Sequence, residues 1–214
     1  MRIAIAYRGV FNFKKINQYG ITPDILPSIQ KNLDNHKNML YNVFDDSEID
    51  FYFSTYNLDK KIDELYKNNL NPKYYGYIPT SMNSHDVWRV HRDHCKNLIS
   101  EIKLYIERSR KSYDLFIFTR PDLKFLQDLK TLNWDYSKFN ILIEHLSSNC
   151  DDNLWVFPTQ FFDAFEKSID SLNVGNRITH EINHELIKNS VPIKYYSKEN
   201  RQEILGHTVF EICK

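Results

Sequence analysis

A cation and a carboxylate lie two residues apart, just after a short apolar run near the middle of the chain. The apolar run is Leu115 to Phe118, and the charged pair that follows it is Arg120 and Asp122. An arginine pairs well with a phosphate, and an aspartate can hold a divalent metal ion that bridges the same phosphates. The spacing therefore indicates a site for a phosphorylated ligand. The alternative is a surface Arg/Asp pair that caps a strand.

A second pattern could do different chemistry, because His180, Glu181 and His184 form a literal HExxH motif. On a helix the two histidines would share one face and could bind zinc, while the glutamate activated a water molecule. A match this short also arises by chance, and the charged Glu185 is an unusual neighbour for it. We therefore expect a polar helix face, with the histidines solvated or touching a bound substrate. A zinc metallohydrolase is the alternative.

Three predicted strands would position the Arg/Asp pair and its neighbours. The run at 115–118 is typical of a strand that is covered on both faces of an α/β sheet. Ile3 to Tyr7 and Ile49 to Tyr56 are two further apolar strands that end in polar residues. Open α/β sheets bind ligands outside the carboxyl ends of their strands. If the three strands are parallel neighbours, their ends therefore line one crevice.

Such a crevice could hold a nucleotide. Tyr7 or Tyr56 would lie beside the base, while Asn57 and backbone amides would meet its edges. Arg8 and Arg120 would lie near the diphosphate, and the glycine after Arg8 would allow the backbone to approach closely. In the alternative, Arg8 is a solvated turn residue and Tyr56 belongs to the core. The predicted nucleotide contacts are Tyr7, Arg8, Gly9, Thr55, Tyr56, Asn57, Arg120 and Asp122.

The rest of the chain alternates between helical and strand patterns. Helices are predicted at 23–44, 58–66, 83–111, 159–172 and 178–189, and short strands at 73–78, 139–144 and 191–196. This alternation predicts one α/β sheet with helices on both faces, although the strand order cannot be read from it. Within the long helix, the basic run from Arg89 to Lys96 is expected to be a solvated face.

Composition limits the classes of protein that the chain can be. Its 214 residues carry 28 basic and 28 acidic side chains, so no overall field attracts nucleic acid. No segment reaches the roughly eighteen apolar residues of a membrane span, and the initial MRIAIAYRG is too short for a secretory signal. Three cysteines without metal-ligand spacing fit a reducing compartment. We expect one cytoplasmic domain that neither binds nucleic acid nor spans a membrane.

Several short motifs also follow one another in a characteristic order. They are a strand ending in Arg8, DFYFSTYN at 50–57, a long helix, YDLFIFTRPDL at 113–123 and DDNLWVF at 151–157. This order resembles small glycosyltransferases of bacterial capsule and large-virus glycan pathways, which are similar to the GT-A nucleotide-sugar fold. The resemblance covers residues 2–165. It implies a Rossmann-like mixed sheet flanked by helices, and one catalytic domain over 1–214 that is complete or cut from a longer protein.

The resemblance also implies roles for particular residues. Arg120-Pro121-Asp122 takes the place of the family's Asp-x-Asp metal motif, so Asp122 would hold a Mn²⁺ or Mg²⁺ ion. His207 would be a late histidine that joins this metal, and a turn or core histidine is the alternative. Asp151 or Asp152 would lie near the acceptor, and a helix or strand cap is the alternative for both.

The implied reaction moves a sugar from a nucleotide-diphosphate donor, a UDP-sugar, to a glycan acceptor. Asp152, with Asp151 as its rival, would take the proton of the acceptor hydroxyl. The metal at Asp122, together with Arg120, would stabilise the charge of the leaving diphosphate. We expect an inverting course, although retention is compatible with the same residues. The third class is a non-catalytic nucleotide- or sugar-binding module, in which Asp122 and Asp152 would be dispensable for any turnover.

Overall fold

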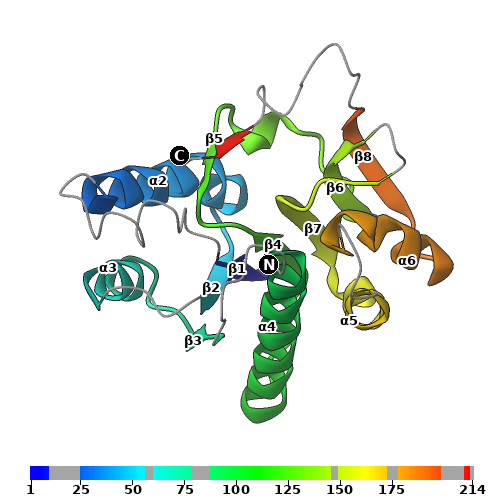
Figure 1. The fold of residues 1–214 in the computed structure, drawn as a ribbon, viewed down its shortest axis with the longest axis horizontal. Helices are drawn as coiled ribbons and strands as arrows, with labels where there is room; N and C mark the ends of the chain where they lie inside the picture. The colour runs from blue at the N-terminus through cyan, green and yellow to red at the C-terminus, as the bar shows by residue number, and fades with distance from the viewer. Residues whose placement is uncertain are drawn as a thin grey trace.

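The computed structural model describes residues 1–9, 25–55, 60–78, 87–145, 149–172, 178–198 and 210–212. Seven strands form the main sheet: β1 (Arg2–Arg8), β2 (Glu48–Thr55), β3 (Tyr74–Tyr77), β4 (Leu115–Thr119), β6 (Phe139–Glu144), β7 (Leu154–Pro158) and β8 (Ile193–Lys198). Their order across the sheet is β3-β2-β1-β4-β7-β6-β8 (Figure 1). A separate two-stranded antiparallel sheet joins β5 (Leu123–Phe125) to β9 (Phe210–Ile212).

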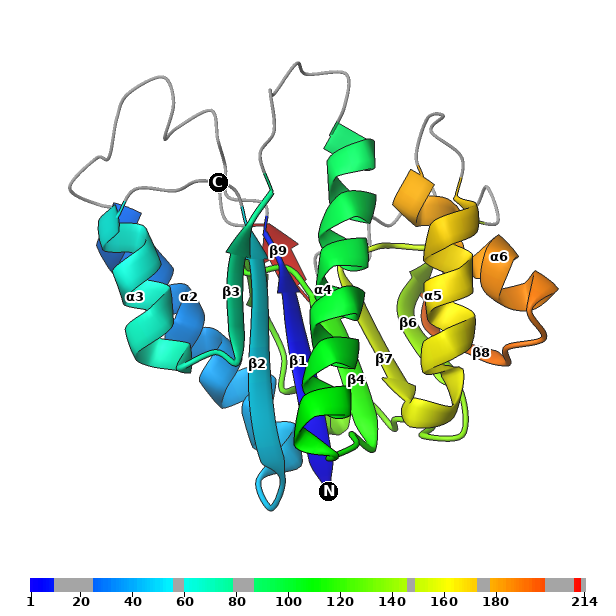
Figure 2. The ribbon, with the colours of Figure 1, turned by 90° about the horizontal axis from the view of Figure 1, so that it is seen from below.

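The half of the main sheet that carries the predicted crevice is parallel. β2 and β4 flank β1 on either side, and β3 pairs with β2 at the edge. Tyr7 of β1 lies opposite Phe53 of β2 and Thr119 of β4, so the strands are nearly in register. Figure 2 shows these strands pointing in one direction. The expected convergence of three carboxyl ends at one edge of the sheet is therefore confirmed.

The other half of the sheet is mixed. β7 runs antiparallel to both β4 and β6, and β8 is parallel to β6. The Asp-Asp segment at 151–152 directly precedes β7. It therefore lies at the same edge as the carboxyl end of β4, because Thr119 of β4 pairs with Leu154 of β7.

Helices cover both faces of the sheet, as the periodicity predicts. α2 (Ile25–Met39) and α3 (Lys60–Leu70) lie on one face, and α4 (Val87–Ser109), α5 (Phe162–Ser171) and α6 (Ile182–Lys188) lie on the other (Figure 1). The short 3-10 turns are η1 (Tyr41–Phe44), η2 (Leu129–Thr131), η3 (Thr159–Phe161) and η4 (Ile178–Glu181). None of the helices in the described part of the chain is long and apolar enough to cross a membrane.

Alternation along β1 decides which layer each of its side chains joins. Ile3, Ile5 and Tyr7 belong to the core beneath α2 and α3, whereas Ala4 and Ala6 belong to the core beneath α4 and α5. Successive strand residues point to opposite faces. The side chains at positions 7 and 8 therefore leave the strand end in opposite directions.

The predicted helices and strands are present, with a few differences. The predicted helix at 23–44 divides into α2 and η1, the one at 159–172 into η3 and α5, and the one at 178–189 into η4 and α6. The β5–β9 pair was not predicted, because its strands are only three residues long and far apart in sequence.

Candidate active site

The carboxyl ends of β1 and β2 touch through their backbones. The amide of Gly9 donates a hydrogen bond of 2.6 Å to the carbonyl of Ser54. A Cβ atom on Gly9 would lie 2.8 Å from Oγ1 of Thr55 and 2.9 Å from the Ser54 carbonyl oxygen. Any larger residue would push the two strand ends apart, so a glycine is required here. Thr55 itself is fully buried at this contact.

At the end of β4, Arg120 and Asp122 form a two-point ion pair. Nε of Arg120 donates to Oδ1 of Asp122 at 3.0 Å, and Nη2 donates to Oδ2 at 2.7 Å. The turn that carries the pair is fixed to α2, because Nδ2 of Asn32 donates to the carbonyl of Pro121 at 2.7 Å. Arg120 retains 12% side-chain exposure and Asp122 retains 4%. The pair therefore lies at the sheet edge with its carboxylate buried, while its arginine still reaches the surface and contacts Oδ1 of Asn153 at 3.4 Å.

Asp122 is chemically suited to a hard cation, but only with help from a ligand. A carboxylate oxygen is the donor that Mg²⁺ or Mn²⁺ prefers. Within the described ranges, no group of three or more His, Cys, Asp or Glu side chains could hold a metal ion. Further oxygens would have to come from the bound molecule, as phosphates commonly provide them for Mg²⁺.

Arg8 leaves β1 on the face opposite to Tyr7. Its side chain is buried beneath α4, with 1% exposure. Its Nη1 lies 3.2 Å from Oδ2 of Asp152, and its guanidinium lies 4.6 Å from the ring centre of Trp155. Nε and Nη2 have no hydrogen-bond partner among the described residues. The alternative that Arg8 is a solvated turn residue is wrong. Its predicted contact with a diphosphate would need the burial around it to open.

Asp152 is held by groups from three elements. Its Oδ2 accepts hydrogen bonds from Nδ1 of His91 at 3.1 Å and from Oγ1 of Thr179 at 2.7 Å, besides the contact with Arg8. Burial alone would raise the pKa of Asp152, but Arg8 and His91 hold that pKa well below its ordinary value. A carboxylate with so low a pKa is a weak base, and this one is 2% exposed. Its environment therefore suits it to anchoring Arg8.

Asp151 accepts hydrogen bonds from the backbone of β6 and of the segment before β7. Its Oδ1 accepts from the amide of Ile143 at 3.1 Å, and its Oδ2 accepts from the amide of Asn153 at 3.3 Å. Burial raises the pKa of Asp151 to about 7, although these amide contacts oppose the shift. The side chain is 1% exposed. The capping alternative for Asp151 agrees with these contacts.

Tyr7 does not face the crevice. Its hydroxyl forms hydrogen bonds with Nδ1 of His36 at 2.7 Å and with the hydroxyl of Tyr41 at 2.6 Å, and it is fully buried. The prediction that Tyr7 lies beside a nucleotide base therefore disagrees with its position in the core. The reason is the strand alternation, which turns position 7 toward α2.

The basic run on α4 corrects another prediction. We expected a solvated face, but His91 is 4% exposed and His94 is fully buried. Nδ1 of His94 lies 2.8 Å from Oγ of Ser54, and burial lowers the pKa of His94 to about 3. The signal was present in the sequence, since positions 91, 94, 95, 98 and 102 recur at helical spacing. These histidines continue the apolar stripe rather than interrupt it.

The HExxH motif is not a continuous helical pair. His180 belongs to η4 and His184 to α6. Nδ1 of His180 donates to the carbonyl of Cys150 at 2.8 Å, and Nε2 of His184 donates to Oδ1 of Asn149 at 3.0 Å. Both rings therefore fasten this turn to the segment before β7, and the arrangement offers no support for a zinc site.

Three predicted residues, Tyr56, Asn57 and His207, lie outside the described residues, and their roles stay predictions.

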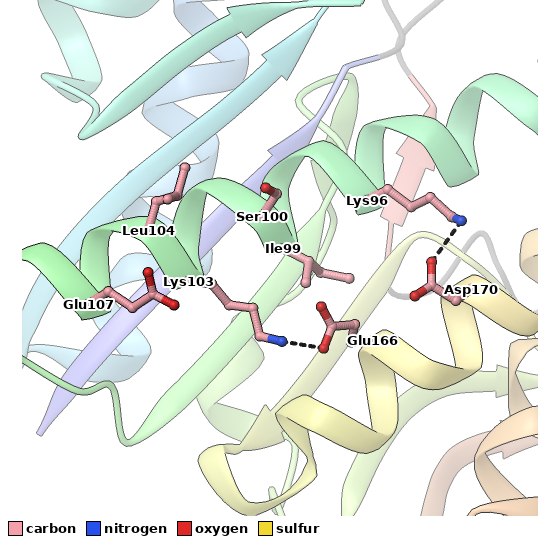
Figure 3. A pocket seen from close by; sticks show the side chains of 8 residues that line it. All are labelled: Lys96, Ile99, Ser100, Lys103, Leu104, Glu107, Glu166 and Asp170. Carbon is pink, nitrogen blue, oxygen red and sulfur yellow. Dashed lines mark hydrogen bonds and ion pairs between the residues drawn. The ribbon is translucent and has the colours of Figure 1, made fainter.

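A groove of about 290 Å³ lies elsewhere, between α4 and α5 (Figure 3). Ion pairs cross it from Lys96 to Asp170 and from Lys103 to Glu166. The groove runs along the flank of the helices and contains none of the predicted site residues, so it is not the candidate site.

No protein family model matches this sequence, and the comparison with curated proteins found no match. Among solved structures, a nucleoside-diphosphate-sugar pyrophosphorylase from Vibrio cholerae RC9 has a TM-score of 0.53 at 11% identity, over 92% of this chain and 91% of that one. The galactosyltransferase LgtC, solved with donor and acceptor sugar analogues, has a TM-score of 0.51 at 11% identity, over 91% and 73%.

A third structure is the mannosyltransferase PcManGT from Pyrobaculum calidifontis, in complex with GDP-Man and Mn²⁺. It has a TM-score of 0.50 at 8% identity, over 92% of this chain and 56% of that one. At such identities the likeness shows the fold alone. The chain has the fold of the GT-A nucleotide-sugar transferases, and the predicted fold class is confirmed.

Proposed function

We propose that the protein is a glycosyltransferase that moves a sugar from a nucleotide-diphosphate donor, a UDP-sugar, to a glycan acceptor. The observation that carries this proposal is the Arg120–Asp122 pair at the carboxyl end of β4, on a sheet with the fold of nucleotide-sugar transferases. Residues 1–214 would form one catalytic domain. A cytoplasmic site is supported by Cys95 and Cys150, which are buried free thiols.

Arg120 would bind the donor by exchanging partners. Its guanidinium now satisfies Asp122 through two parallel hydrogen bonds, and a diphosphate can accept the same two-point contact. In this exchange Arg120 would turn from Asp122, and from Oδ1 of Asn153 that its Nη1 contacts at 3.4 Å, toward the diphosphate. The released carboxylate of Asp122 would then be available to a cation that the diphosphate also binds.

A divalent cation, Mn²⁺ or Mg²⁺, fits Asp122 in this liganded arrangement. When bound it would neutralise charge on the leaving diphosphate. Without a nucleotide, Asp122 already has a cationic partner, so binding of the metal should depend on the donor. The mannosyltransferase neighbour holds Mn²⁺ together with its nucleotide sugar. His207 stays a predicted further ligand.

The group that takes the acceptor's proton is less well supported. Asp152 was the predicted base, but its low pKa and its contacts with Arg8 and His91 suit a positioning role. Asp151 has a pKa near neutrality but holds two backbone amides. An inverting course stays a prediction, since it needs a base on the acceptor side.

A nucleotidyltransferase is the second candidate, because the pyrophosphorylase from Vibrio cholerae shares the fold. The two reactions release different products. The protein should be incubated with a panel of UDP-sugars and glycan acceptors while release of UDP is measured, and separately with UTP and sugar 1-phosphates while release of pyrophosphate is measured. Acceptor-dependent release of UDP supports the proposal, and release of pyrophosphate alone overturns it in favour of the second candidate.

Two variants control this assay. Arg120→Ala should abolish most of the activity. Arg108→Ala removes an exposed arginine at the far end of α4 and should leave it unchanged. Equal activity in both variants would remove Arg120 from the site.

A further inference from the structure

An exposed tyrosine ends β3 at the same edge of the sheet. Tyr77 is 42% exposed, and it lies opposite Thr55 of β2. Thr55 in turn lies beside Gly9, which follows β1. The ring therefore lies two strands from the glycine at the end of β1, on the side of the sheet away from β7.

The Tyr77 ring is fixed in place by its hydroxyl and by a T-shaped contact with the Tyr75 ring. Its hydroxyl donates to Oδ2 of Asp63 at 2.5 Å, and the hydroxyl of Tyr75 donates to Oδ1 of the same carboxylate at 2.7 Å. The Tyr75 ring meets the Tyr77 ring edge-on, at 5.8 Å between centres and 79° between planes. Tyr75 itself stacks on Phe53 in the core, at 5.0 Å and 9°. An exposed ring that is held on two sides is a preorganised stacking surface.

The hydroxyl of Tyr77 stays a hydrogen-bond donor to Asp63. Partial burial, together with the hydrogen bond to Asp63, raises the pKa of Tyr77 to about 12. The phenol therefore stays protonated at neutral pH and continues to donate to Asp63. The orientation of the ring should not change over the ordinary pH range.

The ring lies on the face of the sheet that carries the Arg120–Asp122 turn. Tyr75 packs with the core beneath α2 and α3, and α2 also anchors Pro121 through Asn32. From β3 to β4 there are three inter-strand spacings, roughly 14 Å in all. Three features thus follow one another along the edge: the ring of Tyr77, the backbone of Gly9 and the side chain of Arg120. A nucleoside diphosphate presents a base, a ribose and two phosphates in the same order.

We propose that Tyr77 is the surface on which the base of the donor nucleotide stacks, and that Asp63 is the residue that positions it. This inference rests on the proposed function and deepens it, because it assigns the base end of the donor to β3. Stacking alone does not choose among bases. Selectivity for uracil would then have to come from hydrogen bonds to its edge.

The test separates the base from the phosphates by using two probes. Wild-type protein, Tyr77→Ala, Tyr77→Phe, Asp63→Asn and Arg120→Ala are titrated calorimetrically with UDP and with inorganic pyrophosphate, each with Mn²⁺. Tyr77→Ala should weaken UDP binding roughly five- to hundredfold, the usual range for losing one base–aromatic stack. Its affinity for pyrophosphate should not change, because pyrophosphate has no base.

The conservative variants test the positioning role. Tyr77→Phe keeps the ring and Asp63→Asn keeps its shape, so each should weaken UDP binding only several-fold and leave pyrophosphate binding unchanged. Arg120→Ala should weaken binding of both probes. A merely structural role for Asp63 would lower thermal stability without separating UDP from pyrophosphate, and that result would overturn its assignment.

Failure of this inference is distinguishable from failure of the proposed function. If Tyr77→Ala binds UDP as tightly as the wild type while Arg120→Ala does not, the base lies elsewhere and the inference is overturned, but the glycosyltransferase proposal survives. If folded wild-type protein binds neither probe, both are overturned. Equal weakening of UDP and pyrophosphate by Tyr77→Ala would also overturn the inference, because it would indicate general disruption of the edge.

Discussion

Two arginine–aspartate pairs lie near the same edge of the sheet, and they are built in opposite ways. Arg8 and Asp152 are separated by 144 residues and meet in a buried layer beneath α4, at 3.2 Å. Arg120 and Asp122 are two residues apart and meet through two hydrogen bonds at the end of β4. The first pair joins β1 to the segment before β7, whereas the second pair closes within one turn, and its arginine makes a longer contact of 3.4 Å to Oδ1 of Asn153.

The difference indicates which pair can exchange a partner for a ligand. Removing Asp152 from Arg8 would leave a charge 1% exposed, with buried nitrogens that already lack partners among the described residues. Opening Arg120–Asp122 frees a guanidinium that retains 12% exposure, so it can meet water or a ligand at the surface. We infer that the buried pair holds the strand ends together and that the local pair meets the substrate.

The largest expected effect is on stability. Asp152→Asn should lower the free energy of unfolding by about 3–5 kcal/mol, the usual cost of leaving one member of a buried ion pair unpaired. Asp122→Asn should cost only about 1–2 kcal/mol, since Arg120 can turn toward water. Urea unfolding of both variants measures the difference. Equal losses would contradict the assignment of separate roles.

The next effect is on binding. Arg120→Ala should weaken UDP binding by about 1.5–3 kcal/mol, the range for a charge-assisted hydrogen bond. Arg120→Lys should recover part of the affinity, because it keeps the charge but not the two-point geometry. Titration calorimetry measures both. Unchanged affinity in Arg120→Ala would assign the phosphates to another residue.

The pH dependence of the free energy of unfolding should reflect the buried groups beneath α4. His94 has a folded-state pKa lowered to about 3 by burial, then by His91 and Arg8, whereas an unfolded histidine titrates near 6.5. Below about pH 6.5 the unfolded chain therefore binds a proton that the folded protein does not. Stability should fall as the pH drops, by up to about 1.4 kcal/mol per unit for this group.

His94→Gln isolates that contribution. Between pH 6.5 and 5 the variant should show a shallower fall in the free energy of unfolding than the wild type, whatever its stability at neutral pH. Urea unfolding at several pH values gives both slopes. Identical slopes would mean that His94 is protonated in the folded protein.

The smallest effect concerns the HExxH motif beside Asp152. His184→Ala removes one hydrogen bond to Asn149 and should cost about 0.5–1.5 kcal/mol. Protein purified without chelator should contain far less than one zinc per chain, in the wild type and the variant alike. Stoichiometric zinc that disappears in His184→Ala would show that this region is a metal centre and not a structural anchor.

The sequence predicted the local features of this edge better than its distant ones. Arg120 and Asp122 were identified because both follow one apolar run. The parallel order of β1, β2 and β4 was assumed and is now confirmed. The opposite directions of Tyr7 and Arg8 follow from strand alternation, which could have been applied to them.

Other contacts could not have been read from the chain. The pairing of Arg8 with Asp152 depends on β7 running antiparallel beside β4, and no local pattern encodes which strands become neighbours. The burial of His91 and His94 was readable from their helical spacing, but their charge favoured a solvated face. Polar side chains on a core-facing stripe are therefore better judged by their position than by their polarity.

The most direct test is calorimetric titration of the wild-type protein with UDP, GDP and CMP, each with and without Mn²⁺. We expect selective binding of UDP that is strengthened by Mn²⁺, with no binding of Mn²⁺ alone, because Arg120 occupies Asp122 until a diphosphate replaces it. The absence of binding by any nucleotide, with the protein shown to be folded, would contradict the central claim.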